Sequence, residues 1–354
     1  MLSLHTIYQR ISGCIAIFNN IILIFLIIYK SHHRVGKYKY FMIYISVFEL
    51  LYAILDVMGA PTIFTKDSVF VVAIYSEQTL VPEIFSEVFC DWYCVFFGVS
   101  MAIFAIHFIY RYLVVSENKM LKNHDSKLIF GMLAFPFLFG LFWLWLVRFF
   151  ISPTEKSDQF LIENHLDRIG VKITDVNYAG VYFWPVGKDG RNHIHWRSSI
   201  GIFIMTIAIT ISVAIIFVFG CKCYNETCTL IKQATQSDSF NKLQTQLFYA
   251  LVLQTAIPVF LMHIPASTGF IASFFNCSIE IFGEVSSVTI CLYPLLDPLP
   301  NLFIINSYRE AIIDAMRAVK QRVFHCKSFK VQVGTGTTIT LDSQSHPVSV
   351  LPTN

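Results

Sequence analysis

Charged residues are scarce in this sequence. Asp, Glu, Lys and Arg make up 14% of its 354 residues, whereas hydrophobic residues make up 55% and include 34 phenylalanines. A soluble domain contains about 25% charged residues, so this composition excludes a soluble globular protein. It predicts an integral membrane protein, to which domain counts based on soluble cores do not apply.

Motifs typical of enzymes and transporters are also missing. The sequence contains no nucleophile elbow, no zinc-protease helix and no phosphate-binding loop, so an enzyme is not expected. No apolar segment carries a row of arginines like a voltage sensor, and no repeat relates the two halves, as in many transporters. The nine cysteines lack the paired spacing of a zinc site, and the sequence predicts no metal, no cofactor and no nucleic-acid partner.

Seven apolar segments, by contrast, are each long enough to cross a bilayer as a helix, for which about 20 residues are needed. They lie at about residues 11–29, 38–60, 88–112, 128–151, 198–221, 246–270 and 279–305. We predict an all-α membrane protein with a seven-transmembrane helix bundle over residues 1–305. A short amphipathic helix on the membrane lipids is expected over 306–326, before a disordered cytoplasmic tail over 327–354.

The basic residues predict how the bundle is oriented. The first connection, "KSHHRVGKYK", carries four Lys and Arg residues and no acid. Most of the other basic residues lie in the third and fifth connections and in the tail. Because short basic connections stay in the cytoplasm, we expect an extracellular N-terminus and a cytoplasmic C-terminus. The first apolar segment is then a signal anchor in the plasma membrane.

Ionisable side chains within the apolar segments are expected to face the bundle interior, because a charge in lipid costs about 2.5–3.5 kcal/mol. Glu49 lies midway along the second segment, and Asp56 shares its face two turns nearer the outer end. We expect Glu49 to act in a conformational switch and Asp56 to approach a ligand pocket. For Asn20, a purely structural contact between helices is the alternative, and for Asp56 a water-exposed position at the rim.

Prolines are concentrated in the sixth and seventh segments. Each proline removes a backbone donor and bends its helix. Pro258 lies in the sixth segment, and Pro294, Pro298 and Pro300 lie in the seventh. Two adjacent bent segments favour a bundle with two alternative packings, and prolines that only shape the helices are the other interpretation.

Three stretches resemble a known family. They are "GKYKYFMIYISVFELLYAILDV" after the first basic connection, "HFIYRYLVV" at the end of the third segment and "YPLLDPLPNLFIINSYREAI" at the end of the seventh. In this order they are similar to the nematode Str-type serpentine chemoreceptors, whose relatives include class R and class J receptors. The resemblance implies an olfactory G-protein-coupled receptor in a sensory-neuron cilium, which binds a small-molecule odorant or other chemical cue and activates a heterotrimeric G protein.

The resemblance to the wider seven-span receptor superfamily also implies the residues of a switch. The third segment ends in Tyr110-Arg111-Tyr112, where the superfamily has an acid before the arginine. The missing acid leaves open which group restrains Arg111. Asp297-Pro298 stands where the superfamily has Asn-Pro. The implied switch and G-protein-coupling residues are Asn20, Glu49, His107, Tyr110, Arg111, Tyr112, Pro258, Asp297, Pro298 and Tyr308.

A ligand pocket is expected in the outer half of the bundle. Its candidate lining residues are mostly aromatic side chains of the third and sixth segments, together with two acids. They are Asp56, Trp92, Tyr93, Phe96, Phe97, Phe260, His263 and Glu284. Such a lining suits a small, uncharged, lipophilic or volatile molecule. An amine would require an acid on the third segment, where Asp91 at the rim is the only candidate.

The connections on the outer side are expected to cover this pocket. The stretch "DVNYAGVYFWPVGKDGRNHIHW" alternates aromatic and polar residues around the turn "KDG", which predicts a β-hairpin over the bundle mouth. Its Tyr182, Phe183 and Trp184 either line the pocket or pack against the helix ends. The run "VFVVAIY" in the loop 61–87 is too short to span, and it is expected to pack on the bundle as loop structure.

Three covalent modifications and two other functions complete the expectations. Cys90 and Cys277 either form a disulfide or stay free, because the long loop 152–197 contains no cysteine for the usual bridge. Asn276 begins an Asn-Cys-Ser glycosylation sequon close to the membrane, and Cys326 is either S-palmitoylated or free.

A ligand-gated channel with a cytoplasmic N-terminus and a transporter are the alternative functions.

Overall fold

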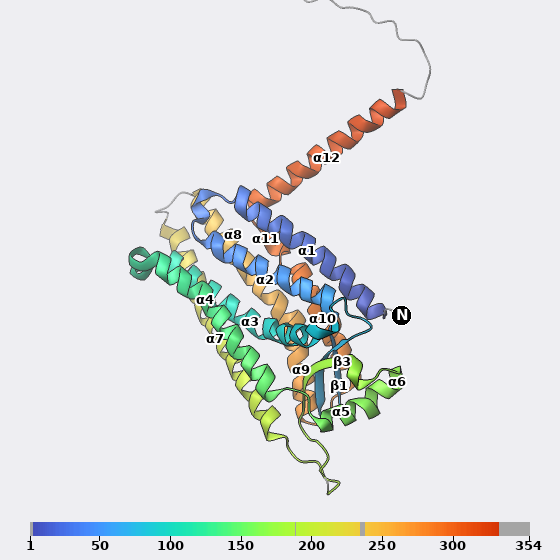
Figure 1. Ribbon diagram of the computed structural model, residues 1–354. Coiled ribbons are helices and arrows are strands. Elements are labelled where there is room, and N and C mark those ends of the chain that lie inside the picture. The colour runs from blue at the N-terminus through green and yellow to red at the C-terminus, as the bar shows by residue number, and fades with distance from the viewer. Residues whose placement is uncertain (1–2, 188, 234–237, 333–354) are drawn as a thin grey trace, which may run out of the picture. The chain divides into compact units, whose positions relative to one another are not determined.

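The computed structural model describes residues 3–187, 189–233 and 238–332, and its course is shown in Figure 1. Seven helices in this part of the chain are long and apolar enough to cross a membrane. The first five are α1 (Leu4–Lys30), α2 (Tyr38–Gly59), α3 (Glu83–Val115), α4 (Lys119–Phe150) and α7 (Trp196–Gln233). The seven-helix bundle expected from the apolar segments is therefore confirmed.

The sixth and seventh crossings are interrupted helices. The sixth consists of α8 (Asp238–Pro258), the π-helix η4 (Val259–His263) and α9 (Ile264–Phe274). The seventh consists of α10 (Glu280–Leu296) and α11 (Leu299–Ile304), which are separated at Asp297 and Pro298. Both interruptions coincide with prolines, because a proline nitrogen cannot donate the helical hydrogen bond.

The bundle is one compact unit, which ends at Arg309. The helix α12 (Asn306–Gln332) begins within it, and residues 310–332 belong to a second unit. In this second unit Met316 and Val319 are exposed. The helix thus continues past the end at 326 expected from the sequence, and the side chain of Cys326 and the tail from 333 lie outside the described residues.

Three strands form an antiparallel sheet at one end of the bundle, which we call the sheet end. The strands are β1 (Thr62–Lys66), β2 (Val69–Tyr75) and β3 (Val176–Tyr182), in the order β1-β2-β3. The hairpin expected within 152–197 is present as a short antiparallel pairing around the turn, in which Val186 pairs with Asn192 and His195 N donates to Phe183 O at 2.8 Å. The sequence did not predict that β3, just before this hairpin, pairs with β2 from the loop 61–87. The run "VFVVAIY" is therefore the central strand of this sheet and not irregular loop structure.

Burial on both faces explains why this central strand is apolar throughout. Phe70 and Val72 face the helix bundle, where they line a cavity. Val71 and Tyr75 point the other way, into a cluster with Leu161 that lies under the short helix α5 (Glu155–Leu161). A strand that is covered on both faces loses the apolar–polar alternation of a half-exposed strand.

Hydrogen bonds tie the sheet to three helices of the bundle. Ile63 N donates to Ser287 Oγ of α10 at 2.7 Å, and Ser273 Oγ of α9 donates to Val69 O at 3.1 Å. Gly180 N donates to Ile151 O, directly after α4, at 2.8 Å. A Cβ atom on Gly283 would lie 2.4 Å from Ile63 O, so only glycine allows α10 to approach β1 this closely. The sheet is therefore a fixed part of the fold.

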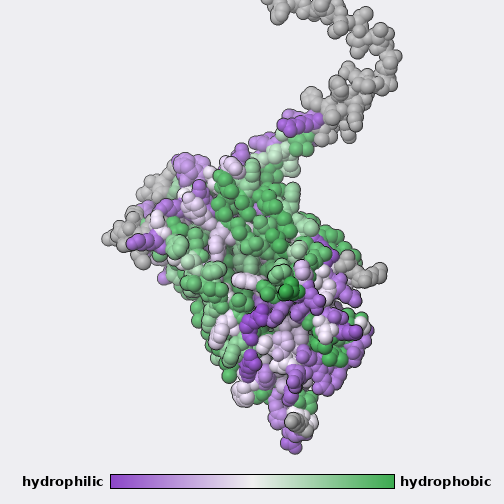
Figure 2. All heavy atoms as spheres, in the orientation of Figure 1, coloured by the Kyte–Doolittle hydropathy of each residue, from purple (hydrophilic) through white to green (hydrophobic). Residues whose placement is uncertain are grey.

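The surface reflects this arrangement. Hydrophobic residues cover the helical part in Figure 2, whereas hydrophilic residues gather over the end that carries the sheet and α5. At that end Arg168 Nη2 and Glu280 Oε2 form an ion pair at 2.7 Å. An apolar belt beside a polar end is what a helix bundle in a bilayer requires.

Candidate functional site

A cavity of about 450 Å³ lies beneath the sheet. Its walls come from the bundle-facing side of the sheet and from α3, α4, α7, α9 and α10. Representative lining residues are Phe70, Val72, Tyr93, Cys94, Phe97, Trp143, Val181, Phe183, Met205, Phe270 and Ile290. Among the described residues, no charged side chain lines it, and its few polar side-chain groups are hydroxyls, one thiol and the indole N–H of Trp143. This size and lining are typical of a site for a small organic ligand.

One glycine determines the position of the cavity's tryptophan. Trp143 of α4 is 2% exposed, and its ring lies against Gly98 of α3. A Cβ atom at Gly98 would come within 2.1 Å of this ring. Because the ring is rigid and buried, any larger residue at this position must displace it. The absence of a side chain at Gly98 therefore allows the Trp143 ring to occupy its place in the cavity wall.

Two of the expected pocket residues line this cavity and a third lies next to it. Tyr93 and Phe97 are lining residues. His263 packs its ring against Phe97 with centroids 4.6 Å apart, and its Nε2 lies 3.0 Å from Ser100 Oγ. Trp92 and Phe96 are not lining residues: the Phe96 ring stacks on Phe48, with centroids 4.7 Å apart, on another face of α3.

The remaining pocket candidates do not line this cavity, for identifiable reasons. Phe260 is 66% exposed, because the π-helix η4 changes the helical phase and turns this residue outward while His263 turns inward. Glu284 is exposed near the start of α10. Asp56 is fully buried but faces α1, where Gln9 Nε2 donates to its Oδ1 at 3.1 Å.

Sequence reasoning missed the sheet, α4 and α7 as walls of the cavity. Phe70 and Val72 lie on a strand that the sequence analysis treated as loop structure, and Trp143 and Met205 lie on helices for which it named no pocket residue. The available signal was the run of residues 69–75, whose apolar pattern indicates a strand covered on both faces. Nothing comparable marks Met205.

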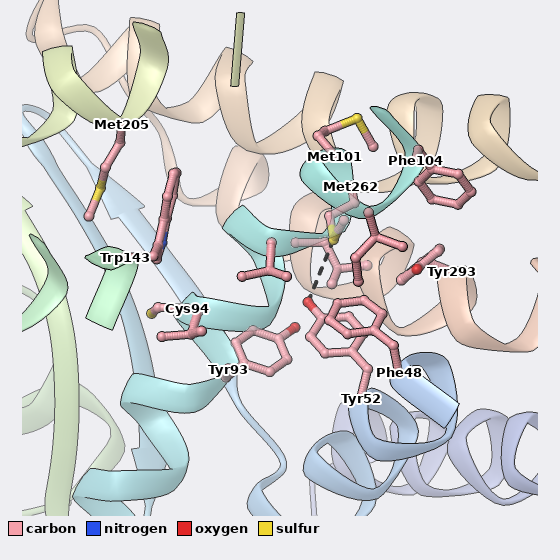
Figure 3. Close-up of a cluster of buried hydrophobic side chains, with 14 of the residues drawn as sticks. Phe48, Tyr52, Tyr93, Cys94, Met101, Phe104, Trp143, Met205, Met262 and Tyr293 are labelled. Atoms are coloured by element: carbon pink, nitrogen blue, oxygen red, sulfur yellow. Dashed lines mark hydrogen bonds between the residues drawn. The ribbon is translucent and has the colours of Figure 1, made fainter. Parts of the chain in front are cut away.

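An aromatic layer lies between the cavity and the middle of the bundle. Figure 3 shows Cys94, Trp143 and Met205 on one side and Tyr52, Met262 and Tyr293 on the other. Tyr93 stacks on Tyr52 with ring centroids 5.3 Å apart. Tyr52 Oη donates to Met262 Sδ at 3.6 Å, and its ring lies 5.7 Å from that of Tyr293. Tyr93 of the cavity wall is therefore connected to α2, η4 and α10 through its neighbour Tyr52.

Beyond this layer, two acids share a buried polar cluster. Glu49 and Asp297 are both fully buried, and their carboxyl groups are close enough to interact electrostatically. Within the described residues, Oε2 of Glu49 and both carboxyl oxygens of Asp297 have no hydrogen-bond partner, and two adjacent carboxylates repel each other. Gln254 Nε2 donates to Glu49 Oε1 at 3.3 Å, and Asn301 Nδ2 donates to Gln254 Oε1 at 3.0 Å. The cluster thus joins α2, α8, α10 and α11.

Asn20 supplies a hydrogen-bond donor to the backbone of the seventh crossing, where the helix is interrupted. Its Nδ2 donates to Pro294 O at 3.2 Å, and the neighbouring Asn19 Nδ2 donates to Leu295 O at 3.2 Å. The residue four positions after Pro294 is Pro298, which has no backbone N–H to offer this carbonyl. The amide of Asn20 therefore replaces the donor that Pro298 lacks.

At the opposite end of the bundle, which we call the Arg111 end, the arginine is clamped by a glutamine. Arg111 is 1% exposed, and its Nη1 donates to Gln244 Oε1 at 2.7 Å. Its Nη2 donates to the backbone oxygen of the same Gln244 at 2.8 Å. The guanidinium also lies over the Tyr38 ring, 5.2 Å from the centroid. These contacts join α3 to α8 and α2 without any acid.

Three other residues implied for the switch lie near this clamp. Tyr110 stacks on Phe41 with centroids 4.2 Å apart, and the His107 ring meets Phe41 edge-on at 5.6 Å. Tyr112 lies under the ammonium group of Lys222 of α7, at 5.7 Å. In a separate contact, Tyr308 Oη lies 2.6 Å from Ser31 Oγ, at the end of α1.

Of the two alternatives for Cys90 and Cys277, the structure shows free thiols. Both thiols are free: Cys90 is buried with its Sγ 3.5 Å from Val72 O, whereas Cys277 is exposed in the turn before α10. The central strand of the sheet therefore lies beside the third helix at Cys90. Asn276 is exposed in the same turn with a φ angle of 56°, so the sequon remains a prediction.

Comparison with solved structures defines the class of this protein. Its fold matches that of squid rhodopsin with a TM-score of 0.60, over 89% of this chain and 85% of that one, at 15% sequence identity. At this identity the match concerns the fold alone. The chain is a multi-pass membrane protein with the rhodopsin-like seven-helix fold.

The sequence comparisons define the family. Residues 5–313 match the family of "Serpentine type 7TM GPCR chemoreceptor Str". The chain is 30% identical to G-protein coupled receptor str-217 of Caenorhabditis elegans over 316 residues, which cover 89% of this chain and 90% of the relative. It is 28% identical to serpentine receptor class r-10 of the same organism over 308 residues, which cover 83% and 86%. The chain belongs to the Str family, and it is a chemosensory G-protein-coupled receptor rather than an enzyme.

Proposed function

We propose that this receptor binds a small, uncharged, lipophilic chemical cue in the 450 Å³ cavity beneath the sheet. The observation that carries this proposal is the lining, which is aromatic and aliphatic and contains no charged side chain among the described residues. An ion or an amine would be desolvated there without a partner, at a cost of several kcal/mol. An uncharged molecule instead gains from the apolar surface that it buries.

Signalling then proceeds from the cavity to the Arg111 end. A ligand that packs differently on Tyr93 in two states of the bundle shifts the balance between those states by its difference in affinity. Tyr93 contacts Tyr52, which borders the Glu49–Asp297 cluster on α2 and α10. In the active state Arg111 leaves Gln244, and a heterotrimeric G protein binds at this end.

The orientation and location follow from the same proposal. The sheet end faces the outside, where a sensory neuron's cilium meets chemical cues, and the Arg111 end faces the cytoplasm. The basic connection that contains Arg34 and Lys37 lies at the Arg111 end, in agreement with the positive-inside rule. A glycosylation tag on the N-terminus tests this, since a channel of the alternative type would keep its N-terminus in the cytoplasm.

The test of function is a second-messenger assay in cells that express the receptor, with a panel of uncharged volatile compounds. We expect at least one compound to produce a response whose potency falls about tenfold in Trp143→Ala, which removes part of the cavity wall. Trp145→Ala is the matched control, because Trp145 on the same helix is 53% exposed and lines no part of the cavity. Arg111→Ala is expected to reach the surface and to remain silent.

Equal potency in the wild type and in Trp143→Ala for every active compound would place the ligand elsewhere. A normal response from Arg111→Ala would remove the proposed role of the Arg111 end in G-protein coupling. The two results are independent, so each half of the proposal is tested separately.

A further inference from the structure

The cavity beneath the sheet is closed on the side where water would enter. Most of the sheet residues that line it are buried, among them Phe70 at 3% and Val181 at 1% exposed, whereas Val72 and Gly180 are half-buried. Behind the sheet lies a second layer, in which Val71 and Tyr178 pack against Leu161 of α5. Backbone and side-chain hydrogen bonds hold this cover to α9, α10 and the end of α4. A ligand from the aqueous side would have to break up two layers.

The exposed part of the cavity wall lies in one direction only. Every exposed side chain that lines the cavity belongs to α7, to α9 or to the residue that directly follows α9. Phe203 of α7 is 66% exposed, Ile271 of α9 is 59% exposed, and Phe275 is 70% exposed. A residue that lines a cavity and is also exposed stands at its opening. The cavity therefore opens sideways, between α7 and α9.

This opening lies at the depth of the lipid chains. α7 begins at Trp196, which is 67% exposed and typical of the membrane interface. Phe203 and Thr210 follow 7 and 14 residues later, which places them about 10 and 21 Å along the helix. The hydrocarbon core is about 30 Å thick, so the opening faces lipid and not water.

The second cavity of the sheet end offers a poor alternative entrance. It has a volume of about 420 Å³ and shares only Ala179 with the first cavity. Arg148 crosses it in ion pairs with Glu87 and Asp91, and Asp158 also lines it. An uncharged lipophilic molecule would have to pass this cluster of charges, which gives it no favourable contact.

We infer that the cavity is loaded from within the membrane, through the opening between α7 and α9, by an uncharged ligand that first partitions into lipid. The inference rests on the proposed function for the identity of the site. It adds the route and the chemical class: the cue is a molecule that dissolves in the bilayer. Permanently charged and strongly hydrated compounds do not partition into lipid, so this route keeps them from reaching the cavity.

Cys94 provides a reporter for the route that needs no signalling. Its side chain lines the cavity and is 9% exposed. In purified receptor in lipid nanodiscs, its labelling is followed by mass spectrometry of the peptide, which separates it from the other cysteines. N-phenylmaleimide is the uncharged lipophilic probe, and a trimethylammonium-ethyl methanethiosulfonate is the charged one. Both rates are divided by the reagent's rate on a free thiol.

We expect the uncharged probe to label Cys94 at least about tenfold faster than the charged one, because a charge is expensive in lipid. Ser267→Trp fills the opening from α9 and is expected to slow this labelling about fivefold or more. Thr268→Trp is the matched control, since Thr268 is the next exposed residue of α9 but lines no part of the cavity. Thr174→Trp fills the second cavity and is expected to leave the rate unchanged.

Thr206→Trp repeats the test from the facing wall on α7, in case Ser267→Trp folds poorly. Equal labelling by both probes, or slower labelling in Thr174→Trp with normal labelling in the two variants at the opening, would overturn the inference in favour of a water route. The proposed function fails separately, if no uncharged compound evokes a response while Cys94 labelling still shows the membrane route.

Discussion

Arg111 of α3 and Gln244 of α8 are joined by two hydrogen bonds, of 2.7 and 2.8 Å, at the buried end of the third helix. One bond reaches the side-chain oxygen and the other the backbone oxygen, so the planar guanidinium is held on two sides. The acid that precedes the arginine in the wider superfamily is Tyr110 here, and Tyr110 stacks on Phe41. A neutral glutamine from another helix thus holds the arginine.

Loss of this clamp should activate the receptor without ligand. Gln244→Leu removes the side-chain acceptor, and a loss of about 1.4 kcal/mol from the restrained state shifts the balance about tenfold toward the active one. We therefore expect basal second-messenger output to rise by up to about tenfold, depending on the starting population. Thr245→Val is the control, because its hydroxyl bonds only to Asn241 O within its own helix. Unchanged basal output in Gln244→Leu would show that this contact does not restrain the receptor.

The pairing of Asn20 with Pro294 O predicts a coupling with Pro298. Asn20→Leu leaves a buried carbonyl without a donor and should cost about 1 kcal/mol, which lowers the melting temperature of the purified receptor by roughly 2 °C. In a Pro298→Ala background the backbone N–H of residue 298 is available, so the same Asn20→Leu change should cost much less.

Asn19→Leu is the matched control for this double-mutant cycle. Asn19 bonds to Leu295 O; the residue four positions later is Leu299, whose backbone N–H is present whether or not residue 298 is proline. Its cost should be the same in both backgrounds. An equal cost of Asn20→Leu with and without Pro298 would mean that Asn20 does not replace the missing donor.

Gly98 and Gly131 predict opposite effects of the same substitution. Gly98→Ala drives a methyl group into the Trp143 ring, which should destabilise the receptor by about 1–3 kcal/mol and reduce ligand potency through the displaced cavity wall. Gly131→Ala on α4 meets open space and should raise stability by up to about 1 kcal/mol, because alanine favours the helix. Thermal unfolding and dose–response curves measure both; equal stability of the two variants would contradict the packing argument.

The two acids of the second helix should differ in what they affect. Glu49→Gln removes one of the two buried acids of this cluster and should change basal or maximal signalling severalfold, with ligand potency nearly constant. Asp56→Asn keeps the shape but weakens the contact with Gln9, so it should lower stability by about 1 kcal/mol without changing potency. A potency shift confined to Asp56→Asn would restore the original expectation that this acid approaches the ligand.

The sequence alone determined the class of the molecule. Scarce charge and seven apolar segments of spanning length leave only a helix bundle in a membrane, since the backbone must satisfy its own hydrogen bonds there. The prolines likewise marked where the sixth and seventh helices are interrupted, because a missing N–H is a local property. The motifs around Arg111 and Asp297 were sufficient to indicate the family.

Tertiary structure alone decided the lining of the cavity and the partner of Arg111. Phe260 was expected in the pocket from helical spacing, but a π-helical turn, which no local pattern reveals, turns it outward. The sheet joins two loops about 100 residues apart, and Gln244 meets Arg111 across 133 positions. Such pairings depend on how helices and strands pack in space, and a periodic pattern in one segment records only that a face is buried, not what covers it.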